Sequence, residues 1–178
     1  MKIALINAIT MSRIFLAIII FILLIQNDSY FLALILFFVA GITDYLDGFL
    51  ARKFSLTSRF GEIIDPIADK ILIIFLFFGL AVNLSSYWIG FIASLIISRE
   101  IWVGALRDYN SAHNNINATK VTFLAKIKTT IQLFTIFIYL TALASNQMLL
   151  IIFGDIFIVI SLLITMYTGY MYTLKTFK

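Results

Sequence analysis

The sequence contains no cysteine, one proline and one histidine among its 178 residues. Without cysteine, the chain can form neither disulfide bonds nor thiolate metal sites. Only 12% of the residues are charged, which is about half the share found in an average soluble domain. This shortage of charge excludes an ordinary water-soluble domain and indicates that much of the chain lies in lipid.

Long apolar runs take the place of the missing charge. Hydrophobic residues make up 62% of the chain, and the mean hydropathy is +1.07. Apolar runs of about 20 residues are typical of membrane helices, whereas membrane barrels have strands of alternating polarity. Six spans are predicted, near residues 5–26, 30–52, 62–83, 86–107, 121–144 and 148–172. The sequence thus predicts an all-α, six-transmembrane-helix protein with a single catalytic domain over residues 1–178.

The N-terminal residues 2–12 are less apolar than the segment that follows them. This composition is compatible with a separate interfacial helix, after which the first span would begin near Arg13. Otherwise the first span runs from residue 5 without a break.

Lysine and arginine gather at alternate breaks between the spans. The first, third and fifth breaks carry neither residue, so all 13 cations lie toward one side of the predicted bundle. The positive-inside rule makes that side cytoplasmic. We therefore expect a multi-pass protein of the cell (inner) membrane with both termini in the cytoplasm. Membrane orientation explains the net charge of +4, so the charge does not indicate a nucleic-acid partner.

Four aspartates lie where the second predicted span ends and the third begins: Asp44, Asp47, Asp65 and Asp69. Helical spacing places each pair on one face of its helix, and the short connection makes the two helices antiparallel neighbours. Carboxylates about 4 Å apart repel each other by roughly 4 kcal/mol at an effective dielectric constant of 20. Protonation or bound cations must relieve this repulsion. Oxygen ligands alone favour hard cations, so we expect Mg²⁺ or Mn²⁺.

Small residues and one arginine accompany the aspartates. Gly48 and Ala51 share the face of the first aspartate pair, and Gly61 lies at the start of the third span. Small side chains leave room for a ligand or another helix to approach. Arg52 lies one turn beyond Gly48 and can hold a phosphate oxygen.

The segment from Asp44 to Asp69 has the pattern D-x2-D-G-x2-A-R-x8-G-x3-D-x3-D. On this pattern the chain resembles the CDP-alcohol phosphotransferase family. The resemblance implies a six-helix homodimer whose active site faces the cytoplasm. It also implies that the four aspartates bind two divalent metal ions and that Asp69 is the general base. The residues it implies for contact with the CDP-lipid are Asn7, Thr10, Gly48, Ala51, Arg52 and Gly61.

Residues 98–107 and 125–132 are similar to the bacterial members of this family that make phosphatidylglycerophosphate. The similarity implies that CDP-diacylglycerol and glycerol 3-phosphate are the substrates, within a membrane of lipids. Glycerol 3-phosphate is an anion, and cations on the fourth and fifth spans can bind its phosphate. The residues expected to do so are Arg99, Arg107, Lys126 and Lys128.

Other acceptors and one other class of protein remain open. Inositol phosphate, phosphatidylglycerol or serine would keep the same chemistry, although serine is neutral and would give the four cations no role. A cation transporter could use the aspartates as an ion site. It would move ions without releasing CMP, and it would leave Arg52 without a function.

Overall fold

The computed structural model describes the backbone of residues 2–26, 29–54, 59–113 and 123–177. It describes the side chains of the same ranges except residues 2–6, 50–54, 59, 60, 62 and 123–126. Within these ranges the chain is helical between short turns and has no strand. The helices are α1 (Lys2–Ile25), α2 (Tyr30–Phe54), α3 (Arg59–Asn83), α4 (Tyr87–Ala112), α6 (Phe123–Ser145) and α7 (Met148–Phe177). Each helix coincides with one predicted span to within a few residues, which confirms the all-α, six-helix prediction.

The first helix is continuous, which contradicts one of the two expectations for the N-terminal segment. α1 runs without interruption from Lys2 to Ile25, so residues 2–12 do not form a separate interfacial helix. This segment contains no glycine or proline, and nothing in it interrupts the backbone hydrogen bonds of a helix. Arg13 consequently lies inside one continuous helix rather than at its beginning.

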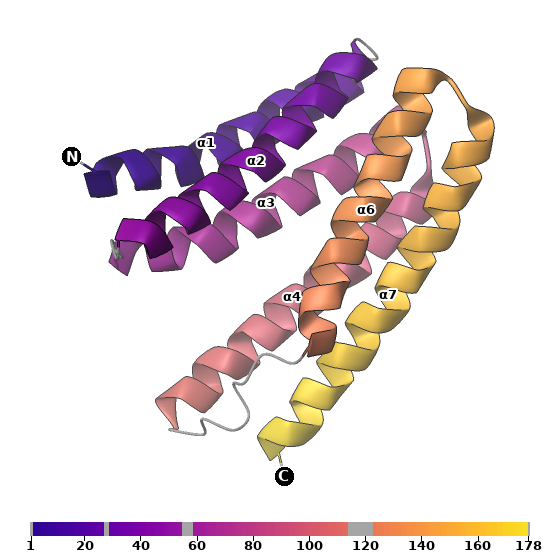
Figure 1. The fold of residues 1–178 in the computed structure, drawn as a ribbon. Helices are drawn as coiled ribbons and strands as arrows, with labels where there is room; N and C mark the ends of the chain where they lie inside the picture. The colour runs from indigo at the N-terminus through magenta and orange to yellow at the C-terminus, as the bar shows by residue number, and fades with distance from the viewer. Residues whose placement is uncertain (1, 27–28, 55–58, 114–122, 178) are drawn as a thin grey trace.

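Three tight connections, between α1 and α2, α3 and α4, and α6 and α7, each contain one residue in the left-handed backbone region. The φ angles are 50° at Ser29, 48° at Ser85 and 55° at Asn146. Ser86 then caps α4, because its side chain accepts a hydrogen bond from the backbone N–H of Ile89. The three connections lie at one end of the molecule, and the two chain termini lie away from it (Figure 1). They are the three breaks that carry no lysine or arginine.

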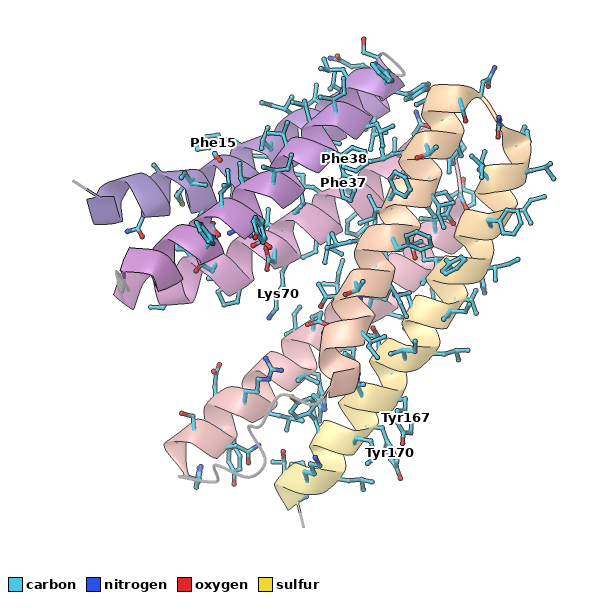
Figure 2. The ribbon with its side chains drawn as sticks, in the orientation of Figure 1. Phe15, Phe37, Phe38, Lys70, Tyr167 and Tyr170 are labelled. Atoms are coloured by element: carbon cyan, nitrogen blue, oxygen red, sulfur yellow. The ribbon has the colours of Figure 1, made fainter. Side chains whose placement is uncertain are left out.

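The helices form two groups that diverge from a common end. In Figure 1, α1, α2 and α3 run together, as do α4, α6 and α7, and the groups meet near the three tight connections. α3 packs against α1 and also against α4 and α6, which joins the groups. Their shared core includes the fully buried Ile20, Leu76, Ile92, Ile136 and Ile158. Away from this core, Lys70 points from α3 into the angle between the two groups (Figure 2).

The outer surface is apolar. α1, α2, α4, α6 and α7 each contain a segment long and apolar enough to cross a membrane. α3 matches α2 in length but carries Asp69 and Lys70 in its first half. Phe15 on α1 and Tyr167 and Tyr170 on α7 are exposed and point away from the bundle (Figure 2). Because so large an apolar surface is typical of contact with lipid, the chain is an integral membrane protein.

Candidate active site

The guanidinium of Arg13, on α1, lies at the centre of the aspartate cluster. Its Nη1 donates a hydrogen bond to Asp44 Oδ1 at 2.5 Å and another to Asp69 Oδ1. Its Nη2 donates to Asp47 Oδ2 at 2.7 Å. Arg13 is 0% exposed. Three predicted site carboxylates, two from α2 and one from α3, therefore converge on one buried cation.

Thr10 joins the fourth carboxylate to the cluster. Its Oγ1 lies 2.9 Å from Asp47 Oδ2 and 2.9 Å from Asp65 Oδ1. One hydroxyl proton serves one acceptor at a time, so the two carboxylates share this donor. Thr10 and Arg13 are three residues apart and share one face of α1. α1 thus supplies the polar side chains that hold the aspartates of α2 and α3 together.

The aspartates differ in their access to the surroundings. The side chain of Asp47 is 5% exposed, whereas that of Asp44 is 56% exposed and that of Asp69 is 45% exposed. Asp65 is also exposed. The buried carboxylate anchors the cluster, and the exposed ones can reach a substrate.

The residues predicted to contact the CDP-lipid lie along the same part of the molecule. Asn7 precedes Thr10 by one turn of α1, and both Asn7 and Gly48 are half-buried. Gly61 is half-buried near the start of α3. Ala51 and Arg52 lie on α2, but their side chains fall outside the described residues. Their contacts with a nucleotide remain a prediction.

The donor set of the cluster suits a hard divalent cation. All four carboxylates offer oxygen ligands alone, as Mg²⁺ and Mn²⁺ prefer. Among the residues that the structure describes, no three acidic side chains surround a ready-made metal position. The guanidinium of Arg13 lies between three of the carboxylates instead. The side chains that would hold a metal are Asp44, Asp47, Asp65 and Asp69.

A cavity of about 230 Å³ adjoins the cluster between α3, α4 and α6. Five charged side chains line it: Asp69, Lys70, Glu100, Arg107 and Lys128. The cavity therefore brings three cations next to one of the aspartates. Two of the cations, Arg107 and Lys128, belong to the predicted phosphate-binding set. The backbone of Lys126 lies in α6, but its side chain is outside the described residues.

Arg107 and Lys128 are held in different ways. Lys128 donates a hydrogen bond to Glu100 Oε1 across the boundary between α6 and α4. Arg107 lies over the ring of Tyr172 at 5.2 Å, and its Nη2 donates to the Tyr172 hydroxyl at 3.2 Å. Its Nε is buried and has no hydrogen-bond partner within the described part of the chain. The two cations give this part of the cavity wall a positive charge that suits an anionic ligand.

Arg99 lies behind this cavity rather than in its wall. Its Nη1 donates to Glu100 Oε1 at 2.9 Å, and its Nη2 donates to Thr168 Oγ1 of α7 at 2.7 Å. Gly169 makes room for it, because a Cβ there would lie 3.0 Å from Arg99 Nε. A chain of polar contacts therefore runs from α7 through Arg99 and Glu100 to Lys128.

An apolar groove of about 610 Å³ is also lined by Asp69 and runs between α2 and α6. Arg13, Asp44 and Asp69 line its polar end. Its apolar walls come mainly from these two helices and include Phe37, Phe38, Gly41, Leu133, Phe134 and Phe137. Phe37 and Phe38 project from α2 on the side where α6 crosses (Figure 2). The groove connects the charged cluster with the apolar surface of the protein.

Arg13 and Lys70 are site residues that the sequence did not assign to a role. The sequence could have indicated a role for Arg13, because an ionisable residue within a membrane span is costly and usually functional. Its position three residues after Thr10 was a second signal. The sequence contained no comparable sign that Glu100 pairs with Lys128, since 28 residues separate them.

The charged cluster and the groove toward lipid define the class of protein, a membrane-embedded enzyme that acts on a lipid headgroup. Residues 3–167 match the sequence model of the CDP-alcohol phosphatidyltransferase family, and the chain belongs to that family. The resemblance inferred from the aspartate pattern is thereby confirmed.

Several curated relatives share one description, CDP-diacylglycerol–glycerol-3-phosphate 3-phosphatidyltransferase. The protein of Wigglesworthia glossinidia brevipalpis is 34% identical over 160 residues, which cover 90% of this chain and 84% of the relative. The protein of Haemophilus influenzae is 38% identical over 107 residues, and that of Escherichia coli K12 is 37% identical over 105 residues. In these last two alignments the chain spans 58% of the relative's length.

Proposed function

We propose that this protein transfers the phosphatidyl group of CDP-diacylglycerol to glycerol 3-phosphate, which gives phosphatidylglycerophosphate and CMP. The observation that carries the proposal is the position of Asp69. Its carboxylate belongs to the acidic cluster, lines the cationic cavity and lines the apolar groove. One residue thus adjoins the places suited to the acceptor and to the lipid donor.

The lipid donor occupies the groove and the aspartate cluster. The acyl chains lie between α2 and α6, along Phe37 and Phe38, while the diphosphate lies at the polar end of the groove. Asn7, Thr10, Gly48, Ala51, Arg52 and Gly61 contact the CDP group. Arg52 supplies positive charge to the diphosphate, and the small residues leave space for it.

Two divalent ions, Mg²⁺ or Mn²⁺, are held by Asp44, Asp47, Asp65 and Asp69. Bound there, they supply positive charge that stabilises the reacting phosphate and the departing CMP. The oxygen-only donor set supports this assignment. Activity that is unchanged by EDTA and by added Mg²⁺ would contradict it.

The acceptor phosphate occupies the cavity beside Asp69. Arg107 and Lys128 bind it, Lys126 contributes from the same helix, and Arg99 supports the wall through Glu100. The 1-hydroxyl of glycerol 3-phosphate then faces Asp69, which removes its proton. The hydroxyl oxygen forms a bond to the β-phosphorus as the bond from that phosphorus to the CMP oxygen breaks. Positioning and electrostatic stabilisation supply most of the rate.

The orientation follows from the positive-inside rule. The three tight connections without cations lie outside the cytoplasm, and both termini and the active site face it. In a bacterium this membrane is the inner membrane. The family resemblance adds a homodimer, which light scattering of the purified protein in detergent would detect as twice the protein mass of one chain.

The decisive experiment offers the purified protein labelled CDP-diacylglycerol with one acceptor at a time. Glycerol 3-phosphate should give phosphatidylglycerophosphate and one CMP per product molecule. Inositol phosphate, phosphatidylglycerol and serine are the competing acceptors, and a faster reaction with any of them would overturn the acceptor assignment. Cation flux in liposomes without CMP release would overturn the enzyme assignment.

A further inference from the structure

Arg13 makes contacts that the proposed reaction does not require of it. It donates hydrogen bonds to Asp44, Asp47 and Asp69, and it is fully buried. No other described cation forms an ion pair with these three aspartates.

The three carboxylates that hold Arg13 are among the four expected to hold metal. Asp44 Oδ1, Asp47 Oδ2 and Asp69 Oδ1 each accept a hydrogen bond from a guanidinium nitrogen. A guanidinium within hydrogen-bond distance of these atoms repels a divalent ion bound to the same carboxylates. Binding of metal and pairing with Arg13 must therefore oppose each other.

Removal of every cation from the cluster would also destabilise the fold. Asp47 is nearly fully buried and accepts from both Arg13 and Thr10. A buried carboxylate that loses its charged partner is strongly destabilising. Arg13 supplies a partner that cannot diffuse away, because it is fixed to α1.

We propose that Arg13 is a tethered counter-ion, which neutralises the aspartate cluster in competition with divalent ions and yields the carboxylate oxygens when those ions bind. This inference rests on the proposed use of divalent metal by the four aspartates. Arg13 then lowers the affinity for metal and protects the fold when metal is scarce.

The experiment measures Mn²⁺ binding and thermal stability, not turnover. Mn²⁺ affinity is determined by electron paramagnetic resonance for purified wild-type protein and for Arg13→Gln. The variant should bind Mn²⁺ roughly tenfold more tightly, which lies within the usual range of coupling between two binding events. Its Tm in EDTA should fall below that of the wild type, and saturating Mg²⁺ should restore most of the loss.

Arg99→Gln is the matched control, because Arg99 is also a buried arginine that pairs with a carboxylate. It should lose stability equally with and without Mg²⁺ and keep the wild-type affinity for Mn²⁺. Arg13→Lys tests the same idea with a retained charge. A single ammonium cannot bind several carboxylates in the way that the forked guanidinium does. The Mn²⁺ affinity of Arg13→Lys should therefore lie between those of the wild type and Arg13→Gln.

The outcomes separate this inference from the proposed function. If the wild type binds no Mn²⁺, the metal assignment itself is wrong. If the wild type binds Mn²⁺ but neither Arg13 variant binds it more tightly, only the counter-ion role is overturned. If both variants are unfolded even in saturating Mg²⁺, Arg13 is required in the metal-bound protein as well, which also overturns that role.

Discussion

Glu100 on α4 accepts a hydrogen bond from the ammonium of Lys128 on α6, and both side chains line the cavity beside Asp69. Arg99 donates to the same carboxylate oxygen at 2.9 Å from outside the cavity. The predicted phosphate-binding cations whose side chains the structure describes therefore divide into two kinds. Lys128 and Arg107 line the cavity, whereas Arg99 contacts Glu100 and does not line the cavity.

Replacement of Lys128 by methionine should chiefly weaken the binding of glycerol 3-phosphate. The variant loses the proposed charge-assisted hydrogen bond to the phosphate of glycerol 3-phosphate. Such a bond is typically worth about 1.5–3 kcal/mol, so the KM for glycerol 3-phosphate should rise about 10- to 100-fold. Initial rates at varied glycerol 3-phosphate and fixed CDP-diacylglycerol give this value. The KM for CDP-diacylglycerol serves as the internal control and should stay close to that of the wild type.

Arg99→Met provides a direct comparison. Because Arg99 lies behind Glu100, this variant should lose thermal stability and show a smaller rise in the KM for glycerol 3-phosphate. A rise as large as that of Lys128→Met, with an unchanged Tm, would show that Arg99 touches the acceptor itself.

Asp69→Asn should remove nearly all turnover while the protein still folds. The amide cannot take up a proton from the acceptor, and general-base catalysis typically contributes about 10²- to 10⁴-fold. CMP release under saturating substrates gives kcat. Because an asparagine could also disturb metal binding, Mn²⁺ affinity is measured in parallel. A variant that binds Mn²⁺ and retains near-normal kcat would exclude Asp69 as the base.

The sequence was sufficient to predict the helices and the main acidic residues. Long apolar runs between polar breaks located the six helices of the described part of the chain, since each run must cover the thickness of the bilayer. Helical spacing alone placed Asp44 beside Asp47 and Asp65 beside Asp69. The continuous α1 was less certain because residues 2–12 are only moderately apolar, and hydropathy does not report whether a helix is interrupted.

The arrangement of the helices around the site was beyond the sequence. The pairing of Arg13 with Asp69 and that of Glu100 with Lys128 depend on which helix faces show toward one another. Local spacing determines which residues share a face, but not which helix covers that face. The same holds for the groove, whose apolar lining comes from α2, α3 and α6.

Gly41→Phe should obstruct the groove between α2 and α6. Gly41 lines the groove, and a Cβ placed there meets no atom within 4 Å, so the new side chain fills space that the lipid needs. The KM for CDP-diacylglycerol should rise several-fold, and that for glycerol 3-phosphate should change little. Gly104→Phe is the matched control, because Gly104 has the same open surroundings and does not line the groove. Equal effects of the two variants would argue against the groove as the lipid site.

A second polar contact joins α6 to α7, far along α6 from Lys128. The hydroxyl of Tyr139 donates to Asp155 Oδ1 of α7 at 2.6 Å, and Tyr139 is fully buried. Neither residue lines the cavity or the groove. A carboxylate in a membrane helix is costly unless it has a partner, so this contact should stabilise the packing of α6 on α7.

Tyr139→Phe should therefore lower stability by about 1–3 kcal/mol, the usual cost of depriving a buried polar group of its partner. Gly154→Ala should cost a similar amount, about 1–3 kcal/mol, through overpacking. A Cβ at Gly154 would lie 2.6 Å from the Tyr139 ring. Thermal unfolding in detergent measures both losses, and kcat below the Tm should not change in either variant.

The double variant Tyr139→Phe with Asp155→Asn tests the pair itself. Because the carboxylate is gone, the double variant should recover part of the stability lost in Tyr139→Phe. A double variant that is less stable than Tyr139→Phe would mean that Asp155 is stabilised by a group other than Tyr139.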